Sequence, residues 1–158
     1  MRVHLPSKLL TACEDEASTH FPLESGGTFM GYVSGDCAYV EAMIPPGPKA
    51  YRGLQAFAPD QEWQLAEIAA LYERSGRIVT YLGDWHSHPN AFSGDLSPRD
   101  RTVLRRIIRS PEARCPQPIM SILYGSPRHW KLSVWRGALL PRKLFGKTLL
   151  VDELRTTR

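Results

Sequence analysis

Two histidines and one aspartate lie within fifteen residues of each other near the middle of the chain. They are His86, His88 and Asp100, and Ser97 lies three positions before the aspartate. Two imidazoles and one carboxylate are a ligand set typical of catalytic zinc, whose fourth position stays open for water. Structural zinc sites usually close all four positions, often with thiolates, and Cys115 has no partner in C-x-x-C spacing. The pattern therefore indicates chemistry at a metal ion.

A strand followed by a helix can bring these residues together. Residues 77–85 are rich in β-branched and aromatic side chains, which predicts a strand. Residues i and i+2 of a strand share a face, so His86 and His88 should project together from its carboxyl end. Ser97 and Pro98 are typical of a helix N-cap and first position, which predicts a helix to about residue 110.

The expected helix would carry Asp100 in its first turn, where a negative side chain suits the helix dipole. Its predicted buried face is apolar and consists of Val103, Leu104, Ile107 and Ile108. The loop before the helix must return the chain to the two histidines. The strand and the helix start would then form one site.

Each of these residues also has a plain structural explanation. A histidine near a strand end usually packs or faces solvent, Ser-Pro usually only caps a helix, and a first-turn aspartate usually serves the helix dipole. The order and spacing of the whole set favour the metal site. The remaining histidines, His4, His20 and His129, lack such a context and are expected to be structural or surface residues.

The same residues resemble the signature of the JAMM (MPN+) metalloproteases. The resemblance covers roughly residues 5–136 and rests on three segments: His86-Ser87-His88-Pro89, Ser97-x-x-Asp100, and the upstream Pro22-Leu23-Glu24-Ser25-Gly26-Gly27 with Gly31. It implies that Zn²⁺ is bound by His86, His88 and Asp100. It also implies that Glu24 is the general acid/base and that Ser97 assists the oxyanion. Eight residues separate His88 from Ser97, one more than in the family, which predicts a one-residue loop insertion.

The string from Tyr81 to Asn90 looks closest to bacterial JAMM isopeptidases of ubiquitin-like conjugation operons, including anti-phage systems of the CBASS and Bil type. The resemblance implies cleavage of the amide bond after the C-terminal glycine of a bacterial ubiquitin-like protein, in deconjugation or precursor processing. The implied partners are that protein or its conjugate, with activating- and conjugating-enzyme-like proteins encoded nearby. Two alternatives stay open: a non-catalytic MPN-type binding module, and a zinc hydrolase acting on a small amide or sulfur-carrier substrate. The intact set of five residues argues against the binding module.

Length and composition place limits around this hypothesis. A chain of 158 residues suits one domain, here residues 1–158, with a real core. No segment approaches the ~20 apolar residues of a membrane span, and the first residues lack an apolar signal-peptide core. Three cysteines at irregular spacing do not form a disulfide framework. A cytoplasmic protein that does not act on membranes is therefore expected.

Charge is distributed unevenly along the chain. Residues 1–98 hold 6 Lys and Arg against 12 Asp and Glu, whereas residues 99–158 hold 14 against 4. Such asymmetry can mark a surface for nucleic acid or for an acidic partner. No recognition helix, zinc finger or stacking-aromatic pattern accompanies it, so no nucleic-acid partner is expected. A solvated arginine-rich helix face explains the charge, and an acidic protein partner stays open.

The remaining elements complete a mixed architecture. Helices are expected over 5–20 and 61–75, the second with a buried face of Leu65, Ile68, Ala69 and Tyr72. Strands are expected over 27–34, 37–44, 118–124 and 129–135, and the tail from residue 137 has no clear pattern. These elements predict an α/β or α+β sandwich. The resemblance implies the JAMM version, a cytidine-deaminase-like three-layer fold in which helices flank a mixed sheet.

Supporting roles can be assigned to a few further residues. Gly26 and Gly27 suit a close backbone approach near the site, because glycine lacks Cβ. Asp84 and Trp85 are candidate supports for the ligands, although an aromatic residue there is more often part of the core. The predicted loop 45–59 either binds an extended substrate tail or is a surface loop anchored by its apolar residues, which are Tyr51, Leu54 and Phe57.

Overall fold

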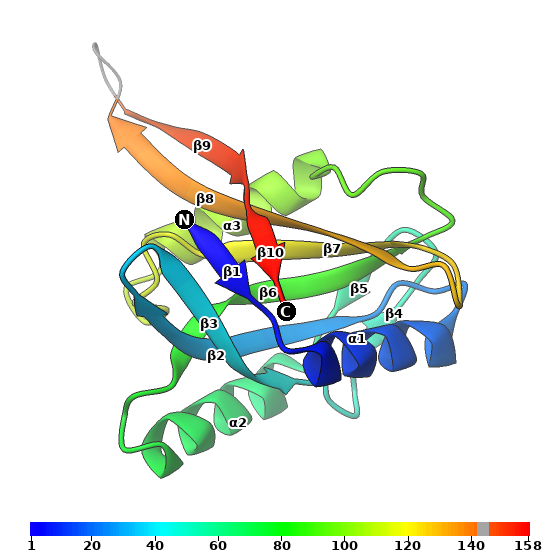
Figure 1. The fold of residues 1–158 in the computed structure, drawn as a ribbon, viewed down its shortest axis with the longest axis horizontal. Helices are drawn as coiled ribbons and strands as arrows, with labels where there is room; N and C mark the ends of the chain where they lie inside the picture. The colour runs from blue at the N-terminus through cyan, green and yellow to red at the C-terminus, as the bar shows by residue number, and fades with distance from the viewer. Residues whose placement is uncertain (142–145) are drawn as a thin grey trace.

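The computed structural model describes residues 1–141 and 146–158 (Figure 1). Its helices are α1 (Ser7–His20), α2 (Gln61–Arg74) and α3 (Pro98–Arg109). The strands of the main sheet are β1 (Arg2–His4), β2 (Gly26–Ser34), β3 (Cys37–Ile44), β6 (Thr80–Pro89), β7 (Ile119–Gly125), β8 (Lys131–Pro141), β9 (Lys147–Glu153) and β10 (Arg155–Thr157). Two short strands, β4 (Tyr51–Arg52) and β5 (Phe57–Ala58), form a separate hairpin.

The main sheet is mixed and has the order β10-β1-β3-β2-β6-β7-β8-β9. Three neighbouring pairs run parallel, namely β1 with β10, β1 with β3, and β6 with β7, and the others run antiparallel. Helices pack against this curled sheet, so the predicted α+β sandwich is confirmed. The strand that carries the two histidines, β6, lies at the centre of the sheet.

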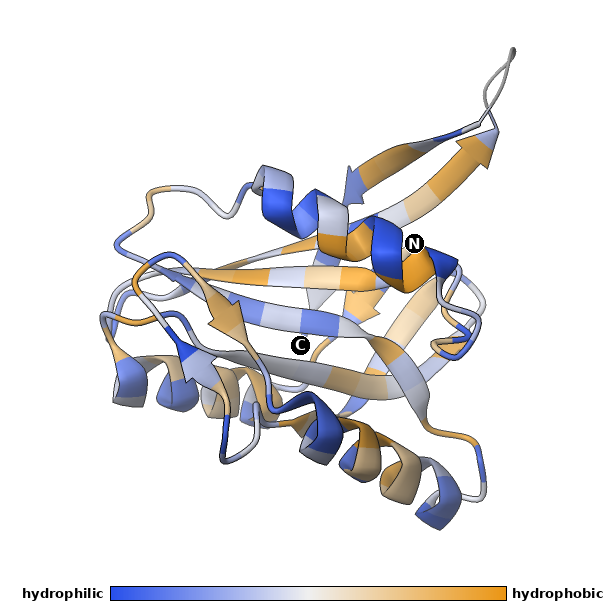
Figure 2. Ribbon diagram, turned by 180° about the vertical axis from the view of Figure 1, so that it is seen from behind, coloured by the Kyte–Doolittle hydropathy of each residue, from blue (hydrophilic) through white to orange (hydrophobic). Residues whose placement is uncertain are grey.

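Apolar residues fill both sides of the sheet. One cluster joins α1 to the sheet through Leu10, Cys13 and Ala17, which meet Phe29 and Trp85. A second cluster surrounds Leu104 of α3, which is fully buried against the neighbouring strands. Figure 2 shows apolar strands in the middle of the molecule and hydrophilic stretches along the helices. The predicted inner face of α3 is confirmed, because Leu104 is buried and its apolar neighbours are half-buried.

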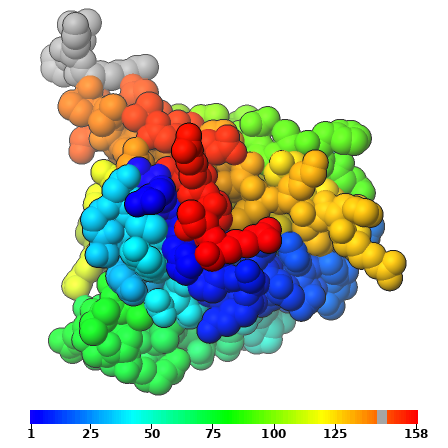
Figure 3. Space-filling view, in the orientation of Figure 1, coloured from blue at the N-terminus to red at the C-terminus, as the bar shows by residue number. Residues whose placement is uncertain are grey.

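The two edges of the sheet are continuous in sequence. Strand β9 pairs with β8 at one edge, and the chain then passes through Leu154 into β10 at the opposite edge. Leu154 is buried in the core, and its amide donates to the carbonyl of Val134. Figure 3 shows the first and last strands side by side on one face. The tail from residue 137, which had no clear pattern, thus supplies the end of β8 and two further strands.

Strand β6 differs in its bounds from the prediction of 77–85. It begins at Thr80, because Arg77 has a φ of +67° and Ile78 is 66% exposed. It runs on to Pro89, because residues 83–89 pair in parallel with β7. Both histidines therefore lie inside the strand rather than beyond it, which fixes their directions.

Helix α2 is rotated relative to its predicted face. Leu65 is 56% exposed, whereas Gln64 is buried. The Gln64 side chain donates to the carbonyl of Pro45 at 3.3 Å, and Trp63 lies against Gly47. Contacts with the chain before β4 therefore set the rotation of the helix, and the apolar spacing alone did not reveal them.

Several expectations about composition can be placed on this fold. All three cysteines are free; Cys13 and Cys37 are buried, and Cys115 is half-buried. Of the α3 arginines expected on a solvated helix face, four are exposed, namely Arg99, Arg105, Arg106 and Arg109, whereas Arg101 is half-buried. Among residues 1–141 and 146–158, no helix has the length and apolar character needed to cross a membrane.

Candidate metal centre

The imidazoles of His86 and His88 meet on one face of β6. Their Nε2 atoms are 3.0 Å apart, and the rings lie edge to face at an interplanar angle of 65°. Burial and the neighbouring His86 ring lower the pKa of His88. A neutral imidazole is the form that binds a metal, so the strand presents His88 in a ligating state.

Helix α3 brings Asp100 to the two histidines. The Asp100 Oδ1 atom lies 3.2 Å from His86 Nε2, and Oδ2 lies 3.8 Å from His88 Nε2. Burial opposes ionisation, but hydrogen bonds from His86 and Ser97 lower the pKa of Asp100 to about 2. The carboxylate is therefore charged at neutral pH although it is buried.

Ser97 and Asp100 fix the start of α3 through a reciprocal cap. The Ser97 hydroxyl accepts from the Asp100 amide at 3.2 Å, and the Asp100 carboxylate accepts from the Ser97 amide at 2.7 Å. The capping box holds two otherwise unsatisfied amides. Asp100 is thus rigid at the position where it faces the imidazoles. The Ser97 hydroxyl, an acceptor in this cap, keeps its own proton free for another partner.

The three side chains have a geometry that suits a small tetrahedral ion. One ligating atom from each of His86, His88 and Asp100 can be chosen so that all lie within 4.8 Å of one another. Bonds of ~2.0–2.1 Å in a tetrahedral site separate ligand atoms by about 3.3 Å. The distances from His86 Nε2 to His88 Nε2, 3.0 Å, and to Asp100 Oδ1, 3.2 Å, are close to that separation. Two nitrogens and one oxygen suit zinc, and the described residues provide no fourth ligand at this place.

Glu24 lies beside the histidines, just before β2. Gly26 pairs with His86 across the sheet, and the Ser87 amide donates to the carbonyl of Ser25. Continuing this antiparallel register places Glu24 next to His88, on the side of the strand that the histidines share. Burial raises the pKa of Glu24, and the charges of His86 and Asp100 also act on it. A half-buried carboxyl with a raised pKa is suited to accept and return a proton.

The glycines after Glu24 allow the backbone to approach β6 closely. A Cβ on Gly26 would lie 2.4 Å from the carbonyl oxygen of Trp85 and 2.9 Å from Cβ of His86. A Cβ on Gly27 would lie 2.4 Å from the carbonyl oxygen of Ile44. No side chain fits there, which explains both glycines.

Substitution of Gly26 by alanine should therefore disturb the site. The added methyl must push the backbone of β2 away from β6, and overpacking of this kind costs about 1–3 kcal/mol of folding free energy. We expect a lower unfolding midpoint and weaker metal binding, measured by thermal unfolding with and without added zinc. Gly35, whose Cβ would meet nothing within 4 Å, is at a turn with φ +57° and controls for turn strain alone. Equal metal affinity in Gly26→Ala and the wild-type protein would contradict the claim that the close approach of β2 to β6 at Gly26 positions the site.

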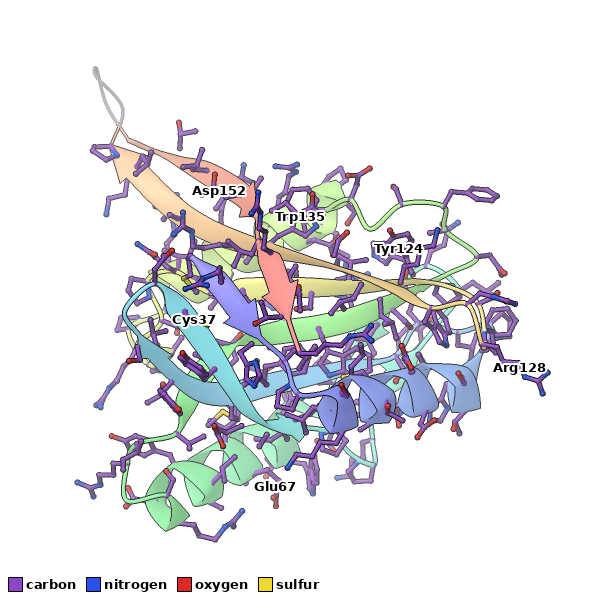
Figure 4. The ribbon with its side chains drawn as sticks, viewed as in Figure 1. Cys37, Glu67, Tyr124, Arg128, Trp135 and Asp152 are labelled. Atoms are coloured by element: carbon purple, nitrogen blue, oxygen red, sulfur yellow. The ribbon has the colours of Figure 1, made fainter. Side chains whose placement is uncertain are left out.

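The loop between His88 and Ser97 is held at its middle. Trp135 of β8 donates its indole N–H to the carbonyl of Gly94 at 2.7 Å, and Tyr124 of β7 also contacts Gly94. Figure 4 shows Trp135 and Tyr124 near this loop. Phe92, by contrast, is fully exposed. The eight-residue spacing therefore fits an anchored loop that leaves one aromatic side chain in solvent.

The β4–β5 hairpin reaches the site from the other side. Its Gly53 carbonyl accepts from the Glu24 amide at 2.8 Å, and the Phe57 ring lies over Gly26. Tyr51 and Leu54 are 62% and 68% exposed, so the alternative of a loop anchored by all three apolar residues is wrong. Phe57 alone is an anchor, and the other two face solvent.

The residues predicted to support the ligands have different roles. Trp85 is 1% exposed and stacks on Phe29, which places it in the core. The Asp84 carboxylate accepts from the Thr28 hydroxyl at 3.1 Å, while burial raises its pKa. Two residues near Glu24, namely Glu16 and Arg52, were not singled out in the sequence. Arg52 lies far from the motifs along the chain, Glu16 lies six residues before Pro22, and no local pattern marks either of them.

The chain is similar to several known proteins. Residues 6–136 match the family described as prokaryotic homologs of the JAB domain. The chain is 46% identical over 156 residues to a probable metalloprotease of Sinorhizobium fredii, y4qB, covering 98% of this chain and 92% of that protein. It is 26% identical over 91 residues to a CD-NTase/cGAS isopeptidase of Escherichia coli, covering 57% of this chain and 58% of that protein.

A solved structure shares the architecture. The solution structure of protein DSY2949 from Desulfitobacterium hafniense superposes with a TM-score of 0.66 at 22% identity. The match covers 98% of this chain and 91% of that chain. At this identity the likeness concerns the fold.

Proposed function

Because the chain belongs to the JAB-type (JAMM, MPN+) metalloprotease family, we propose that it is a zinc-dependent peptidase that cleaves after the C-terminal glycine of a ubiquitin-like protein. The observation that carries this proposal is the convergence of His86, His88 and Asp100 beside the half-buried carboxyl of Glu24. These residues would act as three metal ligands and one general base. The amide bond would be an isopeptide in a conjugate or a peptide in a precursor.

The proposed mechanism divides the work between the ion and the protein. When bound, zinc would lower the pKa of a water molecule toward ~7 and polarise the scissile carbonyl. Glu24 would take the proton from the attacking water and give it to the leaving amine. The partial burial of Glu24 supports this role, since a raised pKa makes the carboxylate a better base.

Ser97 and Asp100 would act together at the start of α3. The Ser97 hydroxyl oxygen already accepts from the Asp100 amide, which orients the group and leaves its proton to donate. Donation to the developing oxyanion is a role typically worth ~3 kcal/mol. The same cap holds the Asp100 carboxylate against His86, so the cap would position both the metal ligand Asp100 and the Ser97 hydroxyl that donates to the oxyanion.

The choice of substrate rests on two supports. One relative of this chain is named an isopeptidase, and its aligned segment covers just over half of each protein. In addition, the β4–β5 hairpin is hydrogen-bonded to Glu24 through Gly53, and its Tyr51 and Leu54 are exposed. Backbone groups of such a hairpin can pair with an extended substrate tail. We further propose a cytoplasmic setting, partner proteins of a ubiquitin-like conjugation system and an anti-phage role.

The substrate proposal predicts a strict requirement for glycine before the scissile bond. A ubiquitin-like protein from the same genome, fused to a reporter, should be cleaved directly after its terminal glycine by zinc-loaded protein. Replacing that glycine with phenylalanine should reduce cleavage by about 100-fold or more, because a displaced carbonyl loses near-attack geometry. Mass spectrometry of the products, with Glu24→Gln protein as the control, measures both the position and the loss.

Two outcomes would contradict the proposed substrate. Equal cleavage of the phenylalanine fusion would remove the glycine requirement. Hydrolysis of a small glycine amide without cleavage of any fusion would favour the small-substrate hydrolase instead.

A further inference from the structure

A partly buried polar cluster surrounds the side chain of Ser25, the residue that follows the proposed general base. The Ser25 hydroxyl, in a residue with no exposed surface, donates to Glu16 Oε1 at 2.6 Å and accepts from Arg52 Nε at 3.1 Å. Arg52 Nη2 also donates to Glu16 Oε1, at 2.9 Å, so the three side chains close a ring. The His20 ring lies 3.3 Å from the same carboxylate oxygen. The cluster therefore joins α1, the start of β2 and β4.

The cluster is connected to Glu24 through the backbone on both sides. Ser25 follows Glu24, its amide donates to the Ser87 hydroxyl at 2.9 Å, and its carbonyl accepts from the Ser87 amide at 2.7 Å. Ser87 is the residue between the two histidines. Gly53 follows Arg52, and its carbonyl accepts from the Glu24 amide. The backbone of Glu24 is thus fixed at once to the metal-binding strand and to the hairpin.

We propose that Glu16, Ser25 and Arg52 are positioning residues that hold Glu24 against His86 and His88 and tie its position to the β4–β5 hairpin. The proposal rests on the role of Glu24 in the proposed function. The side chains of Arg52 and Glu16 are only 17% and 21% exposed, so the pair has lost much of its hydration. Such a pair adds little stability compared with apolar packing, but its hydrogen bonds hold the two side chains in one direction and at one distance. A proton-transfer group needs such a fixed position, because a displacement of 1 Å can cost about 100-fold in rate.

The same connections make the hairpin part of the catalytic arrangement. A substrate tail that contacts exposed Tyr51 or Leu54 touches the strand and turn that carry Arg52 and Gly53. Arg52 is hydrogen-bonded to Ser25, and Gly53 is hydrogen-bonded to Glu24. Ordering of the hairpin by the substrate would therefore order the base, so the cluster should act on turnover more than on substrate binding.

Four variants test the proposal: Arg52→Ala, Glu16→Ala, Glu16→Gln and the double alanine variant. We expect Arg52→Ala to lower kcat about 10- to 100-fold while KM changes less than about threefold and the zinc content stays the same. Glu16→Gln keeps an acceptor oxygen for Ser25 and Arg52, so it should retain most of the kcat that Glu16→Ala loses. The double variant should lose little more than either single variant, because both act through one cluster.

The matched control is Arg136→Ala, which breaks another half-buried ion pair between an arginine and a carboxylate. Arg136 Nη2 lies 2.7 Å from Asp152 Oδ2, between β8 and β9 and away from the site. This variant should show a lower unfolding midpoint without a change in kcat. A kcat for Arg52→Ala equal to that of Arg136→Ala, or full additivity in the double variant, would reduce the cluster to a structural tie and overturn the proposal.

Hydrogen exchange gives a readout that does not depend on activity. The Glu24 amide, held by Gly53, should exchange about tenfold faster or more in Arg52→Ala than in Arg136→Ala, because the hairpin is released. This measurement stands even if the wild-type protein cleaves no ubiquitin-like fusion, in which case the proposed function fails by itself. Equal exchange at Glu24 in the two variants would show that Arg52 does not hold the base.

Discussion

Glu24→Gln protein should bind zinc as well as the wild-type protein does and lose about 10²–10⁴-fold in turnover. The amide of glutamine has nearly the shape of the carboxylate, but it cannot carry the proton. Glu24 lies next to the three proposed ligands, and it is not a member of the converging group of His86, His88 and Asp100. Metal content by elemental analysis and kcat on a cleaved fusion measure the two properties separately.

The unfolding midpoint is the control measurement for this variant. The Glu24 amide and the Ser25 hydrogen bonds involve backbone or neighbouring side chains, and burial disfavours the charged carboxylate, so Glu24→Gln should not lower the unfolding midpoint. Near wild-type turnover in Glu24→Gln would assign the base to another group. Loss of zinc would instead make Glu24 a ligand.

His88→Ala protein should lose both the metal and the activity. The wild-type protein should bind about one zinc per chain, with ligand distances of ~2.0–2.2 Å. Changing groups that only support ligands costs 10- to 100-fold in metal affinity, so removing a ligand should weaken zinc binding by more than about 100-fold. Competition with a chromophoric chelator measures the affinity, and turnover should fall below detection at micromolar zinc.

A histidine outside the site separates a ligand from a merely structural residue. His4 lies on β1 beside Tyr39, far from β6 in the order of the sheet, and His4→Ala should keep the full zinc content. His88→Ala protein that retains stoichiometric zinc would refute the assignment of this ligand. So would wild-type protein that holds no transition metal after purification without chelators.

Motifs close together in the chain were the predictable part of this molecule. The distance between His86 and His88 is set by the strand period, and Ser97 with Asp100 is a helix cap whose chemistry is local. Both arrangements are present, including the reciprocal hydrogen bonds of the cap. The roles of these residues in catalysis stay predictions that the variants above test.

Contacts between distant segments were the part that the sequence did not reveal. Arg52 reaches Ser25 and Glu16 only because the β4–β5 hairpin folds back on the start of β2, and no pattern in residues 45–59 marks that return. Helix α2 shows the same limit, since the contact of Gln64 with Pro45 outweighs the apolar spacing of Leu65. The spacing of apolar residues predicts which face of a helix is buried when one face is clearly more apolar than the others. Where two faces are similarly apolar, as in α2, tertiary contacts decide which of them is buried.

The joined edges of the sheet bear on how much of the chain the fold needs. The segment that matches the family, residues 6–136, contains the whole candidate site but lacks β1, β9 and β10. Without them, β3 and β8 would each present a row of unpaired amides and carbonyls to solvent. Such strands recruit other chains and promote aggregation. The last twelve described residues, remote from the chemistry, therefore cover the edges of β8 and β1 and leave the outer positions of the sheet to strands of seven and three residues, and short edge strands are one way in which proteins limit such pairing.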